Sequence, residues 1–124
     1  MRRLSLLVIL LVVLSGCSGE RLEFLGSSEN WKVFYVVEVS GGDRQETTGT
    51  IEYIGDEPPP ETFDYEMVNV LTVLGETGKH LKEGKATIGN DRCNDCRTLQ
   101  KDDELEVAIK WDGQTENLTL NNSK

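Results

Sequence analysis

The fold class is decided by LEVAIKWDGQTENLTLN, residues 105–121. Apolar residues alternate with polar ones on both sides of Asp112-Gly113, which is typical of two strands that each bury one face. Asp-Gly favours a two-residue turn of type I′, because that turn needs positive φ at both positions. The stretch therefore predicts an antiparallel hairpin with Trp111 in the core.

Working outward from this hairpin, the rest of the chain also predicts strands. Trp31–Ser40 alternates with period two and carries apolar side chains on both faces, so we expect a central strand. Further strands are expected at residues 21–25, 47–54, 62–73 (one long or two short) and 85–88 (a short edge strand). Turns or loops are expected at residues 40–43, 56–60 with their three prolines, and 75–84. Strands about every ten residues, without helical periodicity, predict an all-β sandwich or small barrel.

The N-terminus has the pattern of a secretory signal. Arg2 and Arg3 precede an apolar segment that ends in Leu14-Ser15-Gly16-Cys17. These four residues resemble the lipobox of bacterial lipoproteins. The resemblance implies that residues 1–16 are removed and that the Cys17 thiol receives a diacylglyceryl group. A membrane-spanning anchor is the alternative, but the apolar run is shorter than the ~20 residues that a span needs.

Cleavage would leave 108 of the 124 residues, enough for one small domain. We expect a short tether at residues 17–20 and the domain at residues 21–124. The tether would hold the domain close to the outer face of the cytoplasmic membrane of a bacterium.

The negative charge of the chain argues against nucleic acid and anionic lipid headgroups as partners. The formal net charge is −9, and it becomes −11 when the two arginines of the signal are removed. Nucleic acid and anionic headgroups both attract Lys and Arg, so neither suits this body. We interpret the negative charge as a source of solubility and not as an acidic binding face. The lipid on Cys17 would supply the attachment to the membrane.

A second resemblance covers most of the mature chain. Residues 26–33, 109–113 and 118–120 resemble the ends of small immunoglobulin-like lipoproteins of Gram-positive bacteria. This resemblance implies an immunoglobulin-like antiparallel β-sandwich of about seven strands. It brings no assigned activity.

Cys93-Asn94-Asp95-Cys96 is the sharpest chemical candidate. A Cys-x-x-Cys pair can be redox-active, can form half of a zinc site or can be a structural disulfide. No helical pattern follows Cys96, and His80 is the only histidine. Paired thiols outside the cytoplasm tend to oxidise. The sequence therefore favours a structural disulfide.

The remaining candidates are interpreted as structural. His80 lies in a polar stretch, and no Gly-x-Ser-x-Gly elbow is present. Asp102, Asp103 and Glu104 could bind Ca²⁺, but a solvated charged turn is the simpler interpretation. Trp31 and Trp111 could stack on a sugar, but their alternating faces predict core positions. No metal site and no cofactor are predicted.

Two hypotheses for function follow. The first is a lipid-anchored, non-catalytic binding or accessory module of the cell envelope, with a protein or wall polymer as ligand. The second is a redox protein that uses Cys93 and Cys96 on exported substrates. The sequence indicates neither the partner nor the oligomeric state.

Overall fold

The computed structural model describes residues 19–122 apart from 42, 70–72 and 95–97. These residues form eight strands and no helix, so the predicted all-β class is confirmed. No helix in the described part of the chain is long and apolar enough to cross a membrane. The strands are β1 (Glu20–Ser27), β2 (Trp31–Ser40), β3 (Arg44–Tyr53), β4 (Thr62–Val68), β5 (Val73–His80), β6 (Lys85–Cys93), β7 (Leu105–Trp111) and β8 (Gln114–Asn122).

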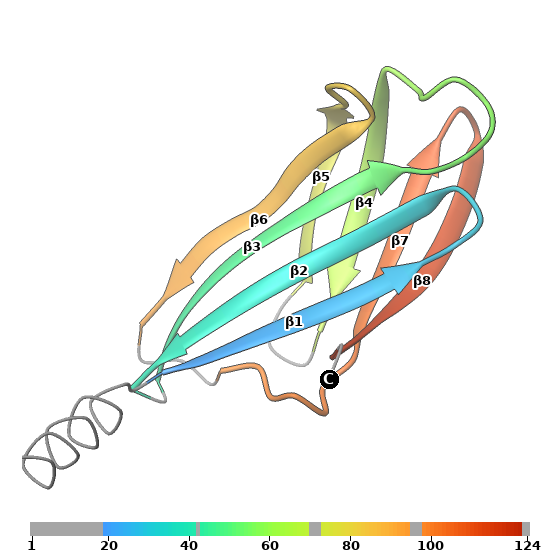
Figure 1. Cartoon of the computed structure of the whole chain (residues 1–124). Coiled ribbons are helices and arrows are strands. Elements are labelled where there is room, and N and C mark those ends of the chain that lie inside the picture. Colours follow the sequence, from blue (N-terminus) through green and yellow to red (C-terminus); the bar gives the residue numbers. More distant parts are fainter. Residues whose placement is uncertain (1–18, 42, 70–72, 95–97, 123–124) are drawn as a thin grey trace, which may run out of the picture.

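All neighbouring strands are antiparallel, in the order β5-β4-β7-β8-β1-β2-β3-β6. Figure 1 shows β6, β3, β2 and β1 curving in front of β5, β4, β7 and β8. The result is one nearly closed, barrel-like sheet with β5 and β6 at its two edges. It has eight strands where about seven were predicted, and an immunoglobulin-like sandwich is not confirmed by this arrangement.

The two best-patterned predictions are confirmed. Asp112 and Gly113 have φ values of 47° and 76°, and they join β7 to β8 as the predicted turn requires. Strand β2 pairs with β1 over residues 32–39 on one side and with β3 along its whole length on the other, so it is central. Strand β1 begins at Glu20, close to the predicted start at Arg21.

The prediction of a loop at residues 75–84 is wrong, because β5 occupies residues 73–80. This strand is polar and mostly exposed, so no alternation marked it; backbone pairing with β4 holds it in place. The predicted strand at residues 62–73 ends at Val68. Strand β6 is an edge strand as predicted but continues beyond Ile88 to Cys93.

Aromatic rings from four strands meet in the core around Trp31. The Trp31 ring lies 5.2 Å from Tyr53, 5.2 Å from Phe63 and 5.4 Å from Trp111 (centroid to centroid). Trp31 and Trp111 are both buried, so their predicted core positions are confirmed. Because these residues come from β2, β3, β4 and β7, the cluster joins the front and back of the sheet.

Within residues 19–122, strands β1 and β8 pair through Phe24↔Asn122 and Leu25↔Asn121. Beside this short ladder, a Cβ atom at Gly26 would lie 2.3 Å from the carbonyl oxygen of Thr119. Only glycine permits this approach, and Gly26 therefore allows β1 to lie against β8.

A partly buried carboxylate on β8 holds the turn between β1 and β2 in place. Glu116 on β8 accepts hydrogen bonds from the Ser28 hydroxyl at 2.6 Å, from the Asn30 backbone N–H at 3.0 Å and from the Asn30 side-chain amide. Burial raises the pKa of Glu116, but these hydrogen bonds outweigh burial and hold its pKa below the ordinary value of 4.5.

We expect Glu116→Gln to lower the free energy of unfolding by about 1–2 kcal/mol at pH 7, because hydrogen bonds to a charged acceptor are lost. The pKa of Glu116 is lower in the folded state, so its contribution is present above pH 4.5 and lost as the pH falls below it. Urea denaturation at several pH values measures both effects. The exposed Glu57→Gln is the control, and equal acid sensitivity of wild type and Glu116→Gln would contradict the assignment.

Candidate functional site

The candidate site is the seam, which we define as the space between the outer edges of β5 and β6. A cleft of about 330 Å³ lies there. Residues 81–84 connect β5 to β6, and Figure 1 shows the two strands separating from this connection. The cleft is lined by Tyr65, Leu74, Gly75, Glu76, Lys79, Thr87, Ile88, Gly89, Asn90 and Asp91.

Both walls of the seam carry an irregularity that bends the strand. On β5 the register shifts between the pairs Phe63↔Lys79 and Tyr65↔Glu76. On β6 it shifts beside Gly89, which has a φ of 57°. An extra residue in an edge strand bends it and increases its twist. The two edges therefore diverge instead of closing the sheet by backbone hydrogen bonds.

A tyrosine side chain connects the two walls. The Tyr65 hydroxyl donates to Glu76 Oε2 on β5 at 2.9 Å, and it accepts a hydrogen bond from the Gly89 backbone N–H on β6. The Gly89 carbonyl in turn accepts from the Thr47 hydroxyl at 2.8 Å. Tyr65 is buried and comes from β4, so this bridge passes beneath the seam at its inner side.

The electrostatics keep this hydroxyl protonated. Burial raises the pKa of Tyr65, and the hydrogen bond to Glu76 and its negative charge raise it further, whereas the Gly89 N–H lowers it. Burial likewise raises the pKa of Tyr35, against the opposing hydrogen bond with Thr47. Tyr65 is therefore a neutral hydrogen-bond donor at physiological pH and does not act as a base.

Backbone groups of β6 face the seam in a regular alternation. Tyr53 N–H donates to Gly84 O, so these two residues form a hydrogen-bonded pair of the antiparallel β3–β6 ladder. Such pairs recur at every second residue, so the backbone groups of Ala86 and Ile88 also bond to β3. Lys85 and Thr87 direct their N–H and C=O groups away from β3. The N–H and C=O of Lys85 are both hydrogen-bonded to the backbone of Lys82, which lies in the connection. Thr87 thus presents a donor and an acceptor to the cleft.

The charged groups of the seam leave an acidic surplus. Glu76 Oε2 lies 3.4 Å from Lys79 Nζ, so the only lysine of the lining is already paired. Asp91, on the opposite wall, is exposed. The arrangement offers carboxylates and backbone hydrogen-bonding groups.

A second cavity lies beside the β7–β8 turn. It has a volume of about 410 Å³, and Phe63 and Trp111 are among its lining residues. Both rings are buried, so neither offers a face on which a ligand could stack.

Of the cysteines singled out from the sequence, Cys93 lies within the described residues. Cys17 and Cys96 are outside the described residues, as is the predicted signal at residues 1–16. Cys93 ends β6 opposite Gln45 and is disulfide-bonded. His80 is exposed at the end of β5, next to the connection to β6. Cys93 lies at the opposite end of β6, which is about 26 Å long. The structure therefore does not bring His80 and Cys93 together. The pairing of Cys93 with Cys96 stays a prediction.

The acidic run at residues 102–104 forms part of a turn. Asp103 Oδ2 accepts from the Gln100 N–H at 2.8 Å, and Asp103 N–H donates back to Gln100 O at 3.1 Å. Within the described residues, no group of three or more His, Cys, Asp or Glu side chains could hold a metal ion.

Sequence reasoning missed the residues that build the seam. Glu76 and Lys79 lie in the stretch predicted to be a loop, and Tyr65 lies in the predicted strand at residues 62–73 with no functional role assigned to it. Gly78 and Gly89 were the available signals, because an isolated glycine within a strand pattern indicates a bulge.

Comparison with known proteins gives no relative for this fold or this site. No family model, no curated protein and no solved structure matches the chain.

We expect Tyr65→Phe to lower the free energy of unfolding by about 1–3 kcal/mol, because the Gly89 N–H loses its acceptor. The pKa of Tyr65 is raised in the folded state above its ordinary value of 10.0. Its contribution is therefore complete below pH 10 and lost as the pH rises further.

Urea denaturation between pH 7 and pH 11 measures this loss. Tyr65→Phe should lose less stability in alkali than the wild type. Tyr53→Phe, which changes a hydroxyl outside the seam, is the control at pH 7. A Tyr65→Phe variant as stable as wild type at pH 7 would show that the bridge does not hold the two walls.

Proposed function

We propose that this chain is a lipid-anchored, extracytoplasmic binding module and not an enzyme. Lipid on Cys17 holds it at the outer face of the cytoplasmic membrane of a bacterium, and the seam between β5 and β6 binds its ligand. The observation that carries the binding role is a cleft beside edge strand β6, toward which the Thr87 backbone groups are directed and which is lined by Glu76, Asp91 and a tyrosine that stays protonated.

The position of the N-terminus supports the anchor. Strand β1 begins at Glu20, only three residues after Cys17. A tether of this length reaches about 10 Å when extended. The lipid therefore places the domain directly on the membrane surface, at the end where β1 begins.

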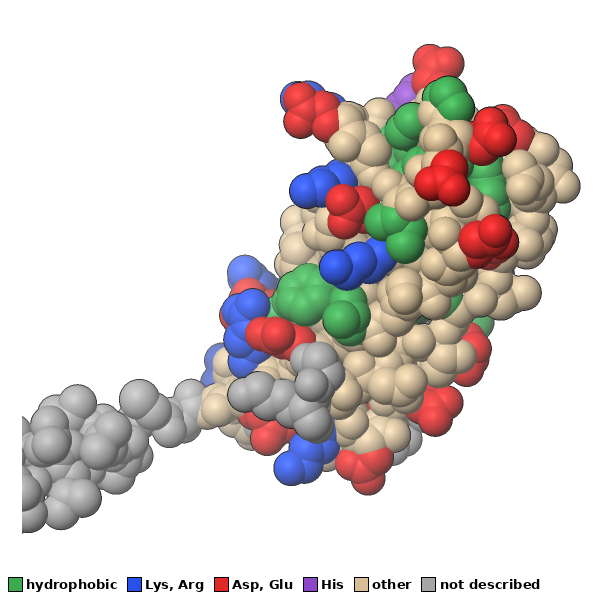
Figure 2. Space-filling view, turned by 45° about the vertical axis from the view of Figure 1, so that its right-hand side comes forward, with side chains coloured by type: hydrophobic (Ala, Val, Ile, Leu, Met, Phe, Trp, Pro, Cys, Tyr) green, Lys and Arg blue, Asp and Glu red, His purple; other side chains and the backbone are tan. Residues whose placement is uncertain are grey.

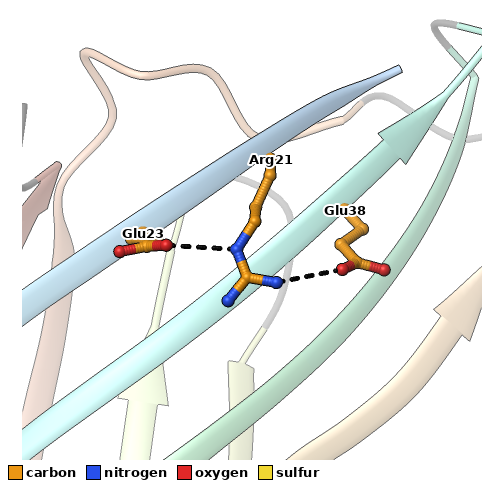
Figure 3. A network of polar contacts seen from close by, with 3 residues as sticks. All are labelled: Arg21, Glu23 and Glu38. Carbon is orange, nitrogen blue, oxygen red and sulfur yellow. Dashed lines mark hydrogen bonds and ion pairs between the residues drawn. The ribbon is translucent and has the colours of Figure 1, made fainter. Parts of the chain in front are cut away.

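Charge at that end does not replace the lipid. Figure 3 shows Arg21 between two carboxylates, with Nε 3.1 Å from Glu23 and Nη1 3.2 Å from Glu38. Arg92 is similarly paired with Glu46 at 3.0 Å. Figure 2 shows acidic side chains spread widely over one face of the domain. Paired arginines on an acidic body attract anionic headgroups weakly, so stable attachment needs the acyl chains.

We also propose that the nearly closed sheet is an immunoglobulin-like sandwich. Its two layers would be β6-β3-β2-β1 and β5-β4-β7-β8. Two features support this interpretation: the layers face each other across a shared core, and only two residue pairs join β1 to β8 within residues 19–122.

The Cys93–Cys96 disulfide would be structural in this account. The chain just after Cys96 is fixed in the interior, since Thr98 and Leu99 are buried. Gln45 Oε1, also buried, accepts from the Leu99 N–H at 2.7 Å. A bridge at this point stabilises the passage of the chain from the end of β6 into the core.

Expression of the full chain in a bacterium tests the anchor. We expect the wild type in the membrane fraction, with an N-terminus at Cys17 that carries the mass of a diacylglyceryl group. Cys17→Ala should incorporate no labelled palmitate, whereas Ser18→Ala should behave as wild type. An uncleaved wild-type chain without label would contradict the proposed anchor.

A further inference from the structure

We propose that the ligand of the seam is an extended polypeptide segment with a lysine or arginine side chain, which adds as a strand along β6. The inference rests on the proposed binding role of this chain and names the chemical class of the ligand. It goes beyond the anchor, because the seam would bind such a segment whether or not Cys17 carries lipid.

The backbone of β6 supplies the first argument. Alternation along the β3–β6 ladder leaves the N–H and C=O of Thr87 directed toward the cleft. The same groups of Lys85 are occupied by Lys82, and the Gly89 N–H is occupied by Tyr65. Thr87 is therefore the position at which an incoming strand finds both a donor and an acceptor. An extended peptide matches such an edge because its own backbone groups alternate with the same period.

The shape of the seam supplies the second argument. The connection at residues 81–84 closes one end, where Lys82 and Lys85 exchange two backbone hydrogen bonds. The cleft begins beyond this closed end, between Leu74–Lys79 on one wall and Thr87–Asp91 on the other. An extended chain can run along the edge of β6 from this closed end and pair with its backbone, whereas a helix already uses its own backbone groups internally.

The charges of the seam select a basic side chain. Glu76 shares its carboxylate between Tyr65 and Lys79, and Asp91 stands on the opposite wall without an ion pair among the described residues. One negative charge is therefore uncompensated. A lysine or arginine of the bound segment would lie near Asp91, whereas an acidic segment would be repelled.

Binding of defined peptides to the full chain in nanodiscs tests the proposal. The first probe is a fluorescent heptapeptide of alternating threonine and valine with a central lysine. The second probe has glutamate in place of lysine. The third keeps the lysine but is N-methylated at every residue, so that its side chains are unchanged and neither edge of its backbone can donate a hydrogen bond. Fluorescence anisotropy measures each dissociation constant.

We expect the lysine probe to bind, the glutamate probe to bind more weakly and the N-methylated probe to show no binding. Asp91→Asn should weaken binding of the lysine probe about threefold, as expected for one exposed charge pair. Glu57→Gln, outside the lining of the seam, is the matched charge control.

The pair Thr87→Pro and Thr87→Val separates the backbone from the side chain. Proline is tolerated on an edge strand where its N–H faces away from the ladder, and it removes the seam-facing donor. We expect Thr87→Pro to weaken binding about fivefold or more. Thr87→Val, which keeps the N–H, should bind as wild type, and urea denaturation confirms that both variants fold.

Equal binding of the N-methylated probe and the unmodified probe would overturn strand addition. Failure of the lysine probe to bind the folded wild type would overturn the proposal altogether. A chain that binds the lysine probe but is not lipidated in bacteria would contradict the anchor and leave the seam's ligand supported.

Discussion

The contacts of Trp31 hold the whole sheet together, because its ring meets aromatic rings from β3, β4 and β7. Strands β1 and β8 pair at Phe24↔Asn122 and Leu25↔Asn121 in the described part of the chain. A large, fully buried ring at the centre links β2 and β3 to β4 and β7 by side-chain packing. The two outer edges of the sheet, β5 and β6, contribute no ring to this cluster.

Those two edges meet through a side chain and not through a ladder. Bulges at Gly78 and Gly89 turn the strands away from each other, and the Tyr65 hydroxyl spans the distance from Glu76 to the Gly89 N–H. The opening stays lined with hydrogen-bonding groups that a fully closed barrel would use internally. In the proposed binding role these groups would supply the specificity, and the proposed lipid anchor would present them near the membrane surface.

The sequence predicted the strands in which burial alternates with exposure. Strands β2 and β7 bury every second side chain over most of their length, and β8 buries Leu118 and Leu120. Asp112-Gly113 permits one specific turn, so pattern alone located these strands. Strand β5 escaped prediction because Glu76 and Lys79 occupy an edge where no second layer demands apolar residues. The role of Tyr65 was equally inaccessible: a tyrosine at a core position has the same pattern whether its hydroxyl is idle or bridges two distant strands.

Residue-resolved amide hydrogen exchange of the full chain tests the open seam most directly. The amides of Ala86 and Ile88 bond to β3, that of Lys85 bonds to Lys82, and that of Thr87 faces the cleft. The account predicts that the Thr87 amide exchanges about tenfold or more faster than the amides of Ala86 and Ile88, because it lacks a backbone partner. Equal protection at residues 85–88 would show that β6 is paired on both sides, and it would contradict the open seam.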